Sequence, residues 1–158
     1  MDFIKNFEEA EKVDKLKTKI MKYILYKKRT EQEIRQKFSE EDENLLEDII
    51  DSLKETGYIN DMDYVERSIK EYMALKNLSI KDMTYKIAQK GANKDSIDEY
   101  ICQNKETVLE YEIASAKKNI IKKRNSNVED EDIKKYLYQK GFMSETVNIA
   151  FDEVENEQ

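Results

Sequence analysis

Hydrophobic residues recur at spacings of three and four along most of the chain, and charged residues fill the positions between them. Near the start, the apolar positions lie on one helical face and the lysines fall mostly on the other; the apolar set is Val13, Leu16, Ile20, Tyr23 and Ile24. This spacing is typical of an amphipathic α-helix. Similar stripes continue to the end of the chain, and together they predict nine helices.

Start and stop signals divide these helices from one another. The run Thr30-Glu-Gln-Glu33 has the form of a capping box, in which the threonine oxygen accepts the backbone N–H three residues on and the glutamate reaches back. Gly57 offers the left-handed conformation that closes a helix. We expect further caps at Ser79, Asn93 and Ser144, and a break at Asn125-Ser-Asn127 after a long helix with the stripe Leu109, Ile113, Ala116 and Ile120.

Two segments fifty residues apart, 81–91 and 131–141, carry the same pattern. In each, one apolar residue is followed four positions later by another, and four positions later by the glycine of a Gln-Lys-Gly ending: Met83, Ile87 and Gly91, then Ile133, Leu137 and Gly141. A more divergent copy with Ile34 and Phe38 lies about one period upstream. Self-similarity at this period is typical of units that bury their apolar faces by stacking on one another.

The Gln-Lys-Gly ending also has a purely local interpretation. Lysine near the negative end of a helix dipole, with glycine just beyond it, forms a good helix stop. That interpretation leaves the recurrent order unexplained, because each glycine is followed by an apolar or small residue, a capping residue and another apolar stripe. We therefore predict an all-α protein with three tandem three-helix repeats at residues 10–59, 60–104 and 105–155.

The composition agrees with a helical array and offers little for catalysis. The 158 residues include no proline, three glycines and 40% charged side chains, and a hydrophobic content of 39% is thin for one compact core. Histidine, the commonest general base and transition-metal ligand, is absent, and the isolated glycines cannot build a phosphate-binding loop. Solvated helix faces explain the 35 acidic residues. We expect no enzyme activity, no catalytic or metal site and no cofactor.

Cysteine usage and hydropathy bear on location. The single cysteine, Cys102, cannot form an internal disulfide, and its place beside Ile101 in a helical pattern predicts a buried or partly buried thiol. No apolar run reaches the roughly eighteen residues of a membrane span, and the acidic start lacks the cationic segment of a signal peptide. We expect a cytoplasmic protein with no membrane partner.

Several motifs carry a family resemblance along residues 12 to 155. A basic segment leads into a threonine-capped helix at Tyr26-Lys-Lys-Arg-Thr-Glu-Gln-Glu-Ile-Arg35, and Gly57-Tyr-Ile-Asn-Asp61 stands where the first repeat meets the second. Lysine–glycine endings follow at Gly91 and Gly141, the latter before Phe142. In their order and spacing these motifs resemble those of the RecX family, bacterial regulators of the RecA recombinase.

The resemblance implies an elongated, curved array of three-helix units that lies in the groove of a RecA nucleoprotein filament. It implies a non-enzymatic regulator of homologous recombination, DNA repair and the SOS response. Members of the family inhibit the ATPase and strand-exchange activities of the recombinase, by blocked filament extension or by promoted disassembly. We expect a monomer whose partners are the RecA filament and single- or double-stranded DNA.

The charge distribution departs from what a DNA-contacting protein suggests, because the formal net charge is −7. Residues 15–37 nevertheless contain nine Lys or Arg and two Glu, which gives +7, whereas residues 40–55 contain eight acids and one lysine, which gives −7. A chain can be acidic overall and still offer a local positive surface to DNA or an acidic partner. The candidate contacts are a first basic cluster of Lys27, Lys28, Arg29 and Arg35, and a second basic cluster of Lys117, Lys118, Lys122, Lys123 and Arg124.

Other interpretations remain open at this point. The two basic clusters also fit solvated helix faces with cations favoured near the helix C-terminus. The tyrosines could stack on bases, but four of them lie at or beside apolar stripe positions, which favours packing: Tyr23, Tyr72, Tyr100 and Tyr136. The alternative functions are a nucleic-acid-binding module that acts without a recombinase, and a general helical scaffold for another protein.

Overall fold

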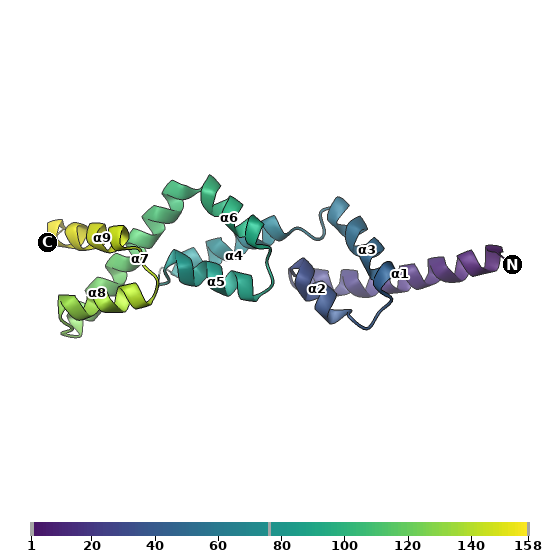
Figure 1. The fold of residues 1–158 in the computed structure, drawn as a ribbon, viewed down its shortest axis with the longest axis horizontal. Helices are drawn as coiled ribbons and strands as arrows, with labels where there is room; N and C mark the ends of the chain where they lie inside the picture. The colour runs from purple at the N-terminus through teal and green to yellow at the C-terminus, as the bar shows by residue number, and fades with distance from the viewer. Residues whose placement is uncertain (1, 76, 158) are drawn as a thin grey trace. The chain divides into compact units, whose positions relative to one another are not determined.

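The computed structural model describes residues 2–75 and 77–157, which form nine α-helices with no strand among them (Figure 1). In chain order the helices are α1 (Asp2–Tyr26), α2 (Glu31–Lys37), α3 (Glu43–Glu55), α4 (Asp61–Leu75), α5 (Ile80–Gln89), α6 (Lys94–Gln103), α7 (Lys105–Asn125), α8 (Asp130–Gln139) and α9 (Ser144–Asn156). The prediction of an all-α protein is confirmed.

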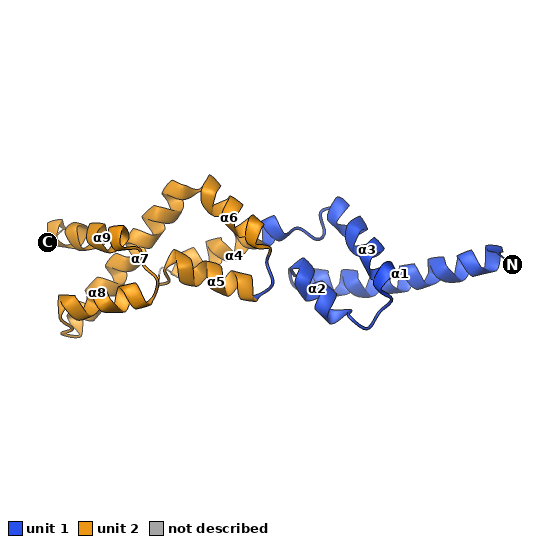
Figure 2. Cartoon of the chain, in the orientation of Figure 1, with its two compact units in different colours: residues 1–64, 90–92 blue, residues 65–89, 93–158 orange. Residues whose placement is uncertain are grey.

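The helices gather into two compact units, shown in Figure 2. The first unit contains residues 1–64 and 90–92, and the second contains residues 65–89 and 93–158. Both units therefore hold parts of the predicted second repeat. The division into three repeats at 10–59, 60–104 and 105–155 stays a prediction.

The core of the first unit is aliphatic and comes from α1, α2, α3 and the turn after α3. Its buried members are Leu16, Ile20, Ile24, Ile34, Leu46, Ile49, Ile50, Leu53 and Ile59. The predicted stripe of α1 is confirmed, since Val13 and Tyr23 pack at the edge of this core. However, α1 begins eight residues before the predicted start of the first repeat, and residues 2–12 are all exposed.

The second unit contains a core formed by α7, α8 and α9 and by Phe142 after α8. The predicted stripe of α7 is only partly right, because Leu109 and Ile113 are half-buried while Glu112 and Ser115 are buried. The predicted cap at Ser144 is wrong. Met143 is the N-cap of α9 and Ser144 its first helical residue, because the buried Phe142 ends the preceding turn with an N–H bond to Leu137 O at 3.0 Å.

In the first unit, Thr30 takes part in two kinds of contact. Its Oγ1 accepts the N–H of Glu33 at 3.1 Å, which completes the predicted capping box of α2. The same hydroxyl donates to the main-chain oxygen of Lys90 at 3.0 Å, sixty positions further along. Gly91 has a φ of +93°, and a Cβ there would lie 2.9 Å from Gln32 Cβ. We call this set of contacts the first joint.

The second joint repeats this arrangement inside the second unit. Ser79 Oγ accepts the N–H of Asp82 at 3.1 Å and donates to Lys140 O at 2.6 Å. Gly141 also has a φ of +93°, and a Cβ there would lie 3.1 Å from Lys81 Cβ. The glycine of Gln-Lys-Gly thus ends its helix and also lets the backbone approach the start of an earlier one. The glycine therefore has two functions: it stops the helix, and it permits a backbone contact that a residue with a Cβ would obstruct.

Each joint also contains a carboxylate. In the first, Asp61 Oδ1 accepts the N–H of Glu31 at 3.1 Å, and in the second, Glu112 Oε1 accepts the N–H of Ile80 at 3.1 Å. A carboxylate at a helix N-terminus satisfies a free amide and interacts well with the dipole. At the corresponding start of α8, fifty positions after Ser79, Glu129 makes no side-chain capping bond. A capping hydroxyl is therefore present at both joints, whereas the start of α8 has a glutamate in its place.

Candidate interaction surface

The first basic cluster lies on α2 and on the turn that precedes it. Lys27 is exposed and makes no ion pair with any residue of the described chain. Lys28 makes an ion pair with Asp63 at the start of α4. The pair is exposed on both sides, so solvent weakens it and a polyanion could compete for the lysine.

Arg29 is fixed by packing more than by charge. Its guanidinium carbon lies 4.1 Å from the ring centroid of Tyr23, and its Nη1 lies 3.6 Å from Glu33. Its Nε is buried and lacks a hydrogen-bond partner within residues 2–75 and 77–157. Stacking on the aromatic face partly offsets that loss. Arg29 therefore helps to close the core edge at Tyr23, which also packs edge-on against Phe38.

Arg35 is bound within the first unit as well. Two of its nitrogens meet the carboxylate of Glu47 at 2.6 and 3.0 Å, and its Nε donates to Glu31 at 3.3 Å. These hydrogen bonds raise the pKa of Arg35 and lower the pKa of Glu47. Lys54 also reaches Glu31, at 2.7 Å. Arg35 thus links α2 to α3 through its ion pair with Glu47.

In the second basic cluster, most members have partners inside the second unit. Lys117 meets Glu153 at 3.4 Å and Glu157 at 2.5 Å, and hydrogen bonding to these carboxylates raises the pKa of Lys117. Arg124 holds both oxygens of Asp130, at 3.0 and 2.9 Å. This contact raises the pKa of Arg124 and lowers that of Asp130. These cations connect α7 to α9 and to the start of α8.

The remaining three lysines of this cluster differ from one another. Lys118 Nζ donates to the main-chain oxygen of Leu75 at 3.0 Å, and Lys123 Nζ lies 4.2 Å from the ring centroid of Tyr136. Lys122 is exposed and has no ion-pair partner among the residues that the structure describes. Next to Lys117 and Lys118, α7 borders an apolar groove of about 550 Å³ lined by Ile113, Ala114 and Ile121. The second basic cluster therefore combines paired cations with an apolar surface.

The burial of the tyrosines agrees with the prediction, whereas the exposure of Cys102 does not. Tyr100 is buried, and the other three tyrosines assigned to packing are half-buried, so packing is confirmed for these four residues. Cys102 is exposed, and the prediction of a buried or partly buried thiol is wrong. Two positions along a helix turn a side chain by about 200°. Cys102 therefore points away from the face that buries Tyr100.

Glu112 is a site residue that the sequence did not indicate. Its side chain is fully buried, accepts the N–H of Ile80 with one oxygen and accepts the hydroxyl of Thr146 with the other at 2.6 Å. Beside it, the hydroxyl of Tyr111 donates to the main-chain oxygen of Leu78 at 2.8 Å and accepts the N–H of the same residue at 3.3 Å. Together they hold the start of α5 against α7.

The described part of the chain contains no metal-ligand cluster and no membrane-spanning helix. Within residues 2–75 and 77–157, no three His, Cys, Asp or Glu side chains are arranged to hold a metal ion. The helices there are also too short or too polar to cross a bilayer.

Known proteins resemble this chain in sequence and in fold, although no family model matches it. Regulatory protein RecX of Clostridium beijerinckii is 27% identical over 158 residues, which cover 96% of this chain and 73% of that protein. Regulatory protein RecX of a Streptococcus pneumoniae strain is 29% identical over 85% of this chain and 54% of its own length. The chain thus spans about three quarters of one relative and about half of the other.

A solved structure agrees with these relatives. The crystal structure of RecX from Lactobacillus salivarius superposes with a TM-score of 0.81, covering 92% of this chain and 98% of that chain at 20% identity. At this identity the superposition shows the shared fold. Together with the sequence relatives, it supports membership of the chain in the RecX family.

Proposed function

We propose that this chain binds the RecA nucleoprotein filament and inhibits its ATPase and strand-exchange activities, by blocking filament extension or by promoting disassembly. The observation that carries the proposal is the relationship to regulatory protein RecX along 96% of the chain. An all-α fold built on repeated helix joints suits a protein that works by binding, because stacked helical units offer long surfaces to a partner. The location that suits this role is the cytoplasm.

The chain is proposed to regulate without catalysing a reaction. It contains no histidine and no glycine-rich phosphate loop, so the usual groups for nucleotide hydrolysis are missing from its sequence. Its effect on ATP hydrolysis would come from changing the recombinase filament. We propose that it acts as a monomer and without a cofactor.

The docking surface is proposed to include the exposed part of the first basic cluster, with Lys27 and Lys28 as its centre. An exposed lysine without a carboxylate partner presents its full charge to phosphates or to acidic side chains. Lys27 meets this description, and Lys28 shares its charge with a single exposed carboxylate. Lys122 is the corresponding candidate in the second basic cluster. Arg35, Lys117 and Arg124 are engaged in internal ion pairs, and we propose that they stabilise the fold and do not form the centre of the docking surface.

The test compares a double charge reversal, Lys27→Glu with Lys28→Glu, with a matched reversal at Lys5 and Lys12. All four lysines are exposed, so each pair changes the charge equally and exposed substitutions alter stability by only about 0.5 kcal/mol each. Arg29 is kept, because a glutamate there would remove the stacking contact with the Tyr23 ring and place a second negative charge beside Glu33. We expect weaker inhibition of the recombinase for the first pair only, with melting curves that differ by no more than the loss of the exposed Lys28–Asp63 ion pair. Equal inhibition by both variants would exclude this docking surface.

Salt dependence distinguishes the filament regulator from a nucleic-acid module that acts alone. Binding through several phosphates weakens steeply as salt rises, since counterions are released from the nucleic acid. A regulator that also recognises the recombinase protein would keep more of its affinity for the filament than a nucleic-acid module keeps for bare DNA. Binding to recombinase without DNA, measured in parallel, separates the filament regulator from a scaffold for another protein.

A further inference from the structure

The N-terminal end of α1 carries an apolar face of its own (Figure 1). Residues 2–12, which we call the α1 extension, are exposed, and they include Phe3 at 82% and Ile4 and Phe7 at 63% each. At about 100° per helix residue, Ile4 and Phe7 point about 160° and 140° away from the buried Ile20. They are therefore not a continuation of the stripe that α1 buries in the first unit. Large apolar side chains gathered on an exposed helix face indicate a contact surface.

The apolar groove beside α7 in the second unit can accept such a helix face. Its volume is about 550 Å³, and its apolar lining comes from Ile113, Ala114 and Ile121. Ile121 is 47% exposed although it is a large aliphatic residue. The stretch of α7 from Glu110 to Ile121 measures about 17 Å and the α1 extension about 15 Å, at about 1.5 Å per residue. The two surfaces match in length and in apolar character, which is the pattern of an amphipathic helix bound in a groove.

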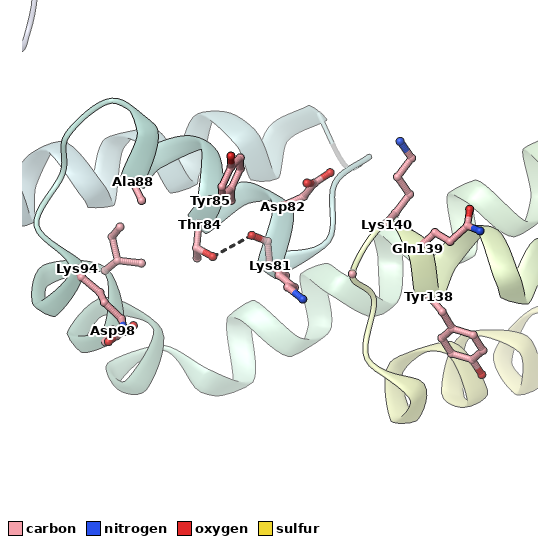
Figure 3. Close-up of a pocket in the computed structure, with 12 residues that line it drawn as sticks. Lys81, Asp82, Thr84, Tyr85, Ala88, Lys94, Asp98, Tyr138, Gln139 and Lys140 are labelled. Carbon is pink, nitrogen blue, oxygen red and sulfur yellow. Dashed lines mark hydrogen bonds between the residues drawn. The ribbon is translucent and has the colours of Figure 1, made fainter.

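The pocket beside the second joint suits an apolar helix face less well. It has a volume of about 420 Å³ and lies between α5, α6 and the end of α8 (Figure 3). Charged and amide side chains form much of its lining: Lys81, Asp82, Lys94, Asp98, Gln139 and Lys140. Covering these groups with phenylalanine rings would remove their hydration and return no hydrogen bonds. The α7 groove is therefore the better match for the α1 extension.

The charges of the two surfaces are also complementary. The α1 extension contains four acids and two lysines, which gives −2, whereas residues 117–124 of α7 contain five cations and no acid, which gives +5. In the groove lining, Lys117 already pairs with Glu153 at 3.4 Å, whereas Lys118 makes no ion pair with residues 2–75 or 77–157. Lys122 lies four positions further along and is exposed, and Glu110 at the other end of the groove can meet a lysine of the extension. Unlike charges are thus available on both sides of the contact.

We infer that the α1 extension of one copy of this chain docks in the α7 groove of a second copy. The extension and the groove belong to different units of the chain, so each copy presents one of each. Such a head-to-tail contact is heterologous and can continue from copy to copy. Three large apolar side chains bury far less than the roughly 1,200–2,000 Å² of a stable interface, so the contact is weak and the chain at low concentration is a monomer. The inference goes beyond the proposed function and requires no recombinase.

Sedimentation velocity of the full chain, from low micromolar to millimolar concentration, tests the contact. We expect the average sedimentation coefficient to rise with concentration. Phe7→Ala should weaken this association by roughly 10- to 150-fold, the effect of losing one buried phenylalanine side chain. Leu25→Ala should leave it unchanged, because Leu25 is 70% exposed on the same helix but lies outside the α1 extension. Melting curves of both variants should equal that of the wild type, since both side chains are exposed.

Crosslinking between two differently tagged copies locates the contact. Both copies carry Cys102→Ser; one adds Ala10→Cys, seven positions after Phe3 on the same helix face, and the other adds Ala114→Cys in the groove. A short bismaleimide should join these two copies efficiently. The control pairs the Ala10→Cys copy with a copy that keeps only the native Cys102, which is exposed and lies outside the groove. We expect little mixed product from the control.

Three results would overturn the inference. The first is a sedimentation coefficient that stays constant up to millimolar concentration, and the second is equal weakening by Phe7→Ala and Leu25→Ala. The third is efficient crosslinking between two copies that both carry Ala10→Cys, without crosslinking to Ala114→Cys, which would mean that two extensions pair with each other. None of these measurements involves the recombinase, so they leave the proposed regulation to be judged on recombinase activity alone.

Discussion

The hydroxyl of Ser79 donates a hydrogen bond to the main-chain oxygen of Lys140 at 2.6 Å, although sixty-one positions separate the two residues. The same hydroxyl accepts the N–H of Asp82, so one buried side chain both starts α5 and joins it to the end of α8. Thr30 and Lys90 repeat this relationship in the first unit, at 3.0 Å. The joint, more than the helix stop, explains the recurrence of Gln-Lys-Gly.

Replacing Gly141 by alanine should destabilise the second unit more than replacing Gly57 destabilises the first. Both glycines have positive φ, at +93° and +83°, so both variants carry the strain of a left-handed conformation, about 1–2 kcal/mol. Only the alanine at 141 also meets neighbours, Lys81 Cβ and Ser79 Oγ at 3.1 Å. We expect an additional cost of about 1 kcal/mol or more in urea unfolding.

Gly57→Ala is the matched control for that experiment, because a Cβ at this position has no atom within 4 Å. Equal free energies of unfolding for the two variants would show that the close approach at the joint contributes nothing. In that case only the backbone conformation would matter.

Replacing Glu112 by alanine should cost about 3–5 kcal/mol. The change leaves the part-buried N–H of Ile80 and the buried hydroxyl of Thr146 without their acceptor, and each such loss costs about 1–3 kcal/mol. Glu110→Ala, on the exposed face of the same helix, should stay within about 0.5 kcal/mol. Chemical unfolding gives both values, and hydrogen exchange should show the largest increase at the first turn of α5. A loss below about 1 kcal/mol would mean that water replaces the carboxylate there.

Replacing Leu137 by alanine should lower the free energy of unfolding by about 2–5 kcal/mol, because the side chain is fully buried in the core of α7, α8 and α9. Ile121→Ala is the control, since Ile121 is 47% exposed on α7. Hydrogen exchange of Leu137→Ala should rise mainly within residues 105–156. An equal rise along the whole chain would indicate a single cooperative core.

Acid should weaken the first unit partly through Glu31. Burial on its own raises the pKa of this carboxyl, but hydrogen bonds from Lys54 and Arg35 lower it below its ordinary value of 4.5. A carboxyl with a lowered folded pKa stabilises the fold above its unfolded value and loses that contribution as pH falls through the folded value. Glu31→Gln should therefore cost about 0.5–1 kcal/mol at pH 7 and clearly less at pH 3.

The control for the acid experiment is Glu8→Gln, an exposed residue of α1 that lacks an ion pair among the described residues. Its effect should be near zero at both pH values. If the cost of Glu31→Gln were the same at pH 3 as at pH 7, the ionised carboxylate would not be its source.

The helices could be predicted because their signals are local. Apolar spacing and capping residues lie within a few positions of the element they define, so Thr30, Ser79 and Asn93 were assigned correctly as caps. Ser144 is not the cap, because α9 starts one residue earlier than predicted: Met143, next to the buried Phe142, is its N-cap. The family could also be predicted, because its motifs extend along most of the chain.

The joints and the pocket could not be predicted in the same way. The partners of Ser79 and Glu112 lie 61 and 34 positions away, and a glutamate among 35 acids carries no sign of burial. The ion pair of Arg35 with Glu47 likewise depends on how α2 packs on α3. Sequence alone located the cations but not their partners, and therefore gave no reason to prefer Lys27 over Arg35.

The most direct test of regulation is the ATP hydrolysis rate of recombinase filaments on single-stranded DNA, titrated with the chain at constant salt. We predict that hydrolysis falls to a low plateau as the chain is added, and that the chain alone hydrolyses no ATP. A rate that stays constant up to a large excess of chain over recombinase would contradict the proposed function.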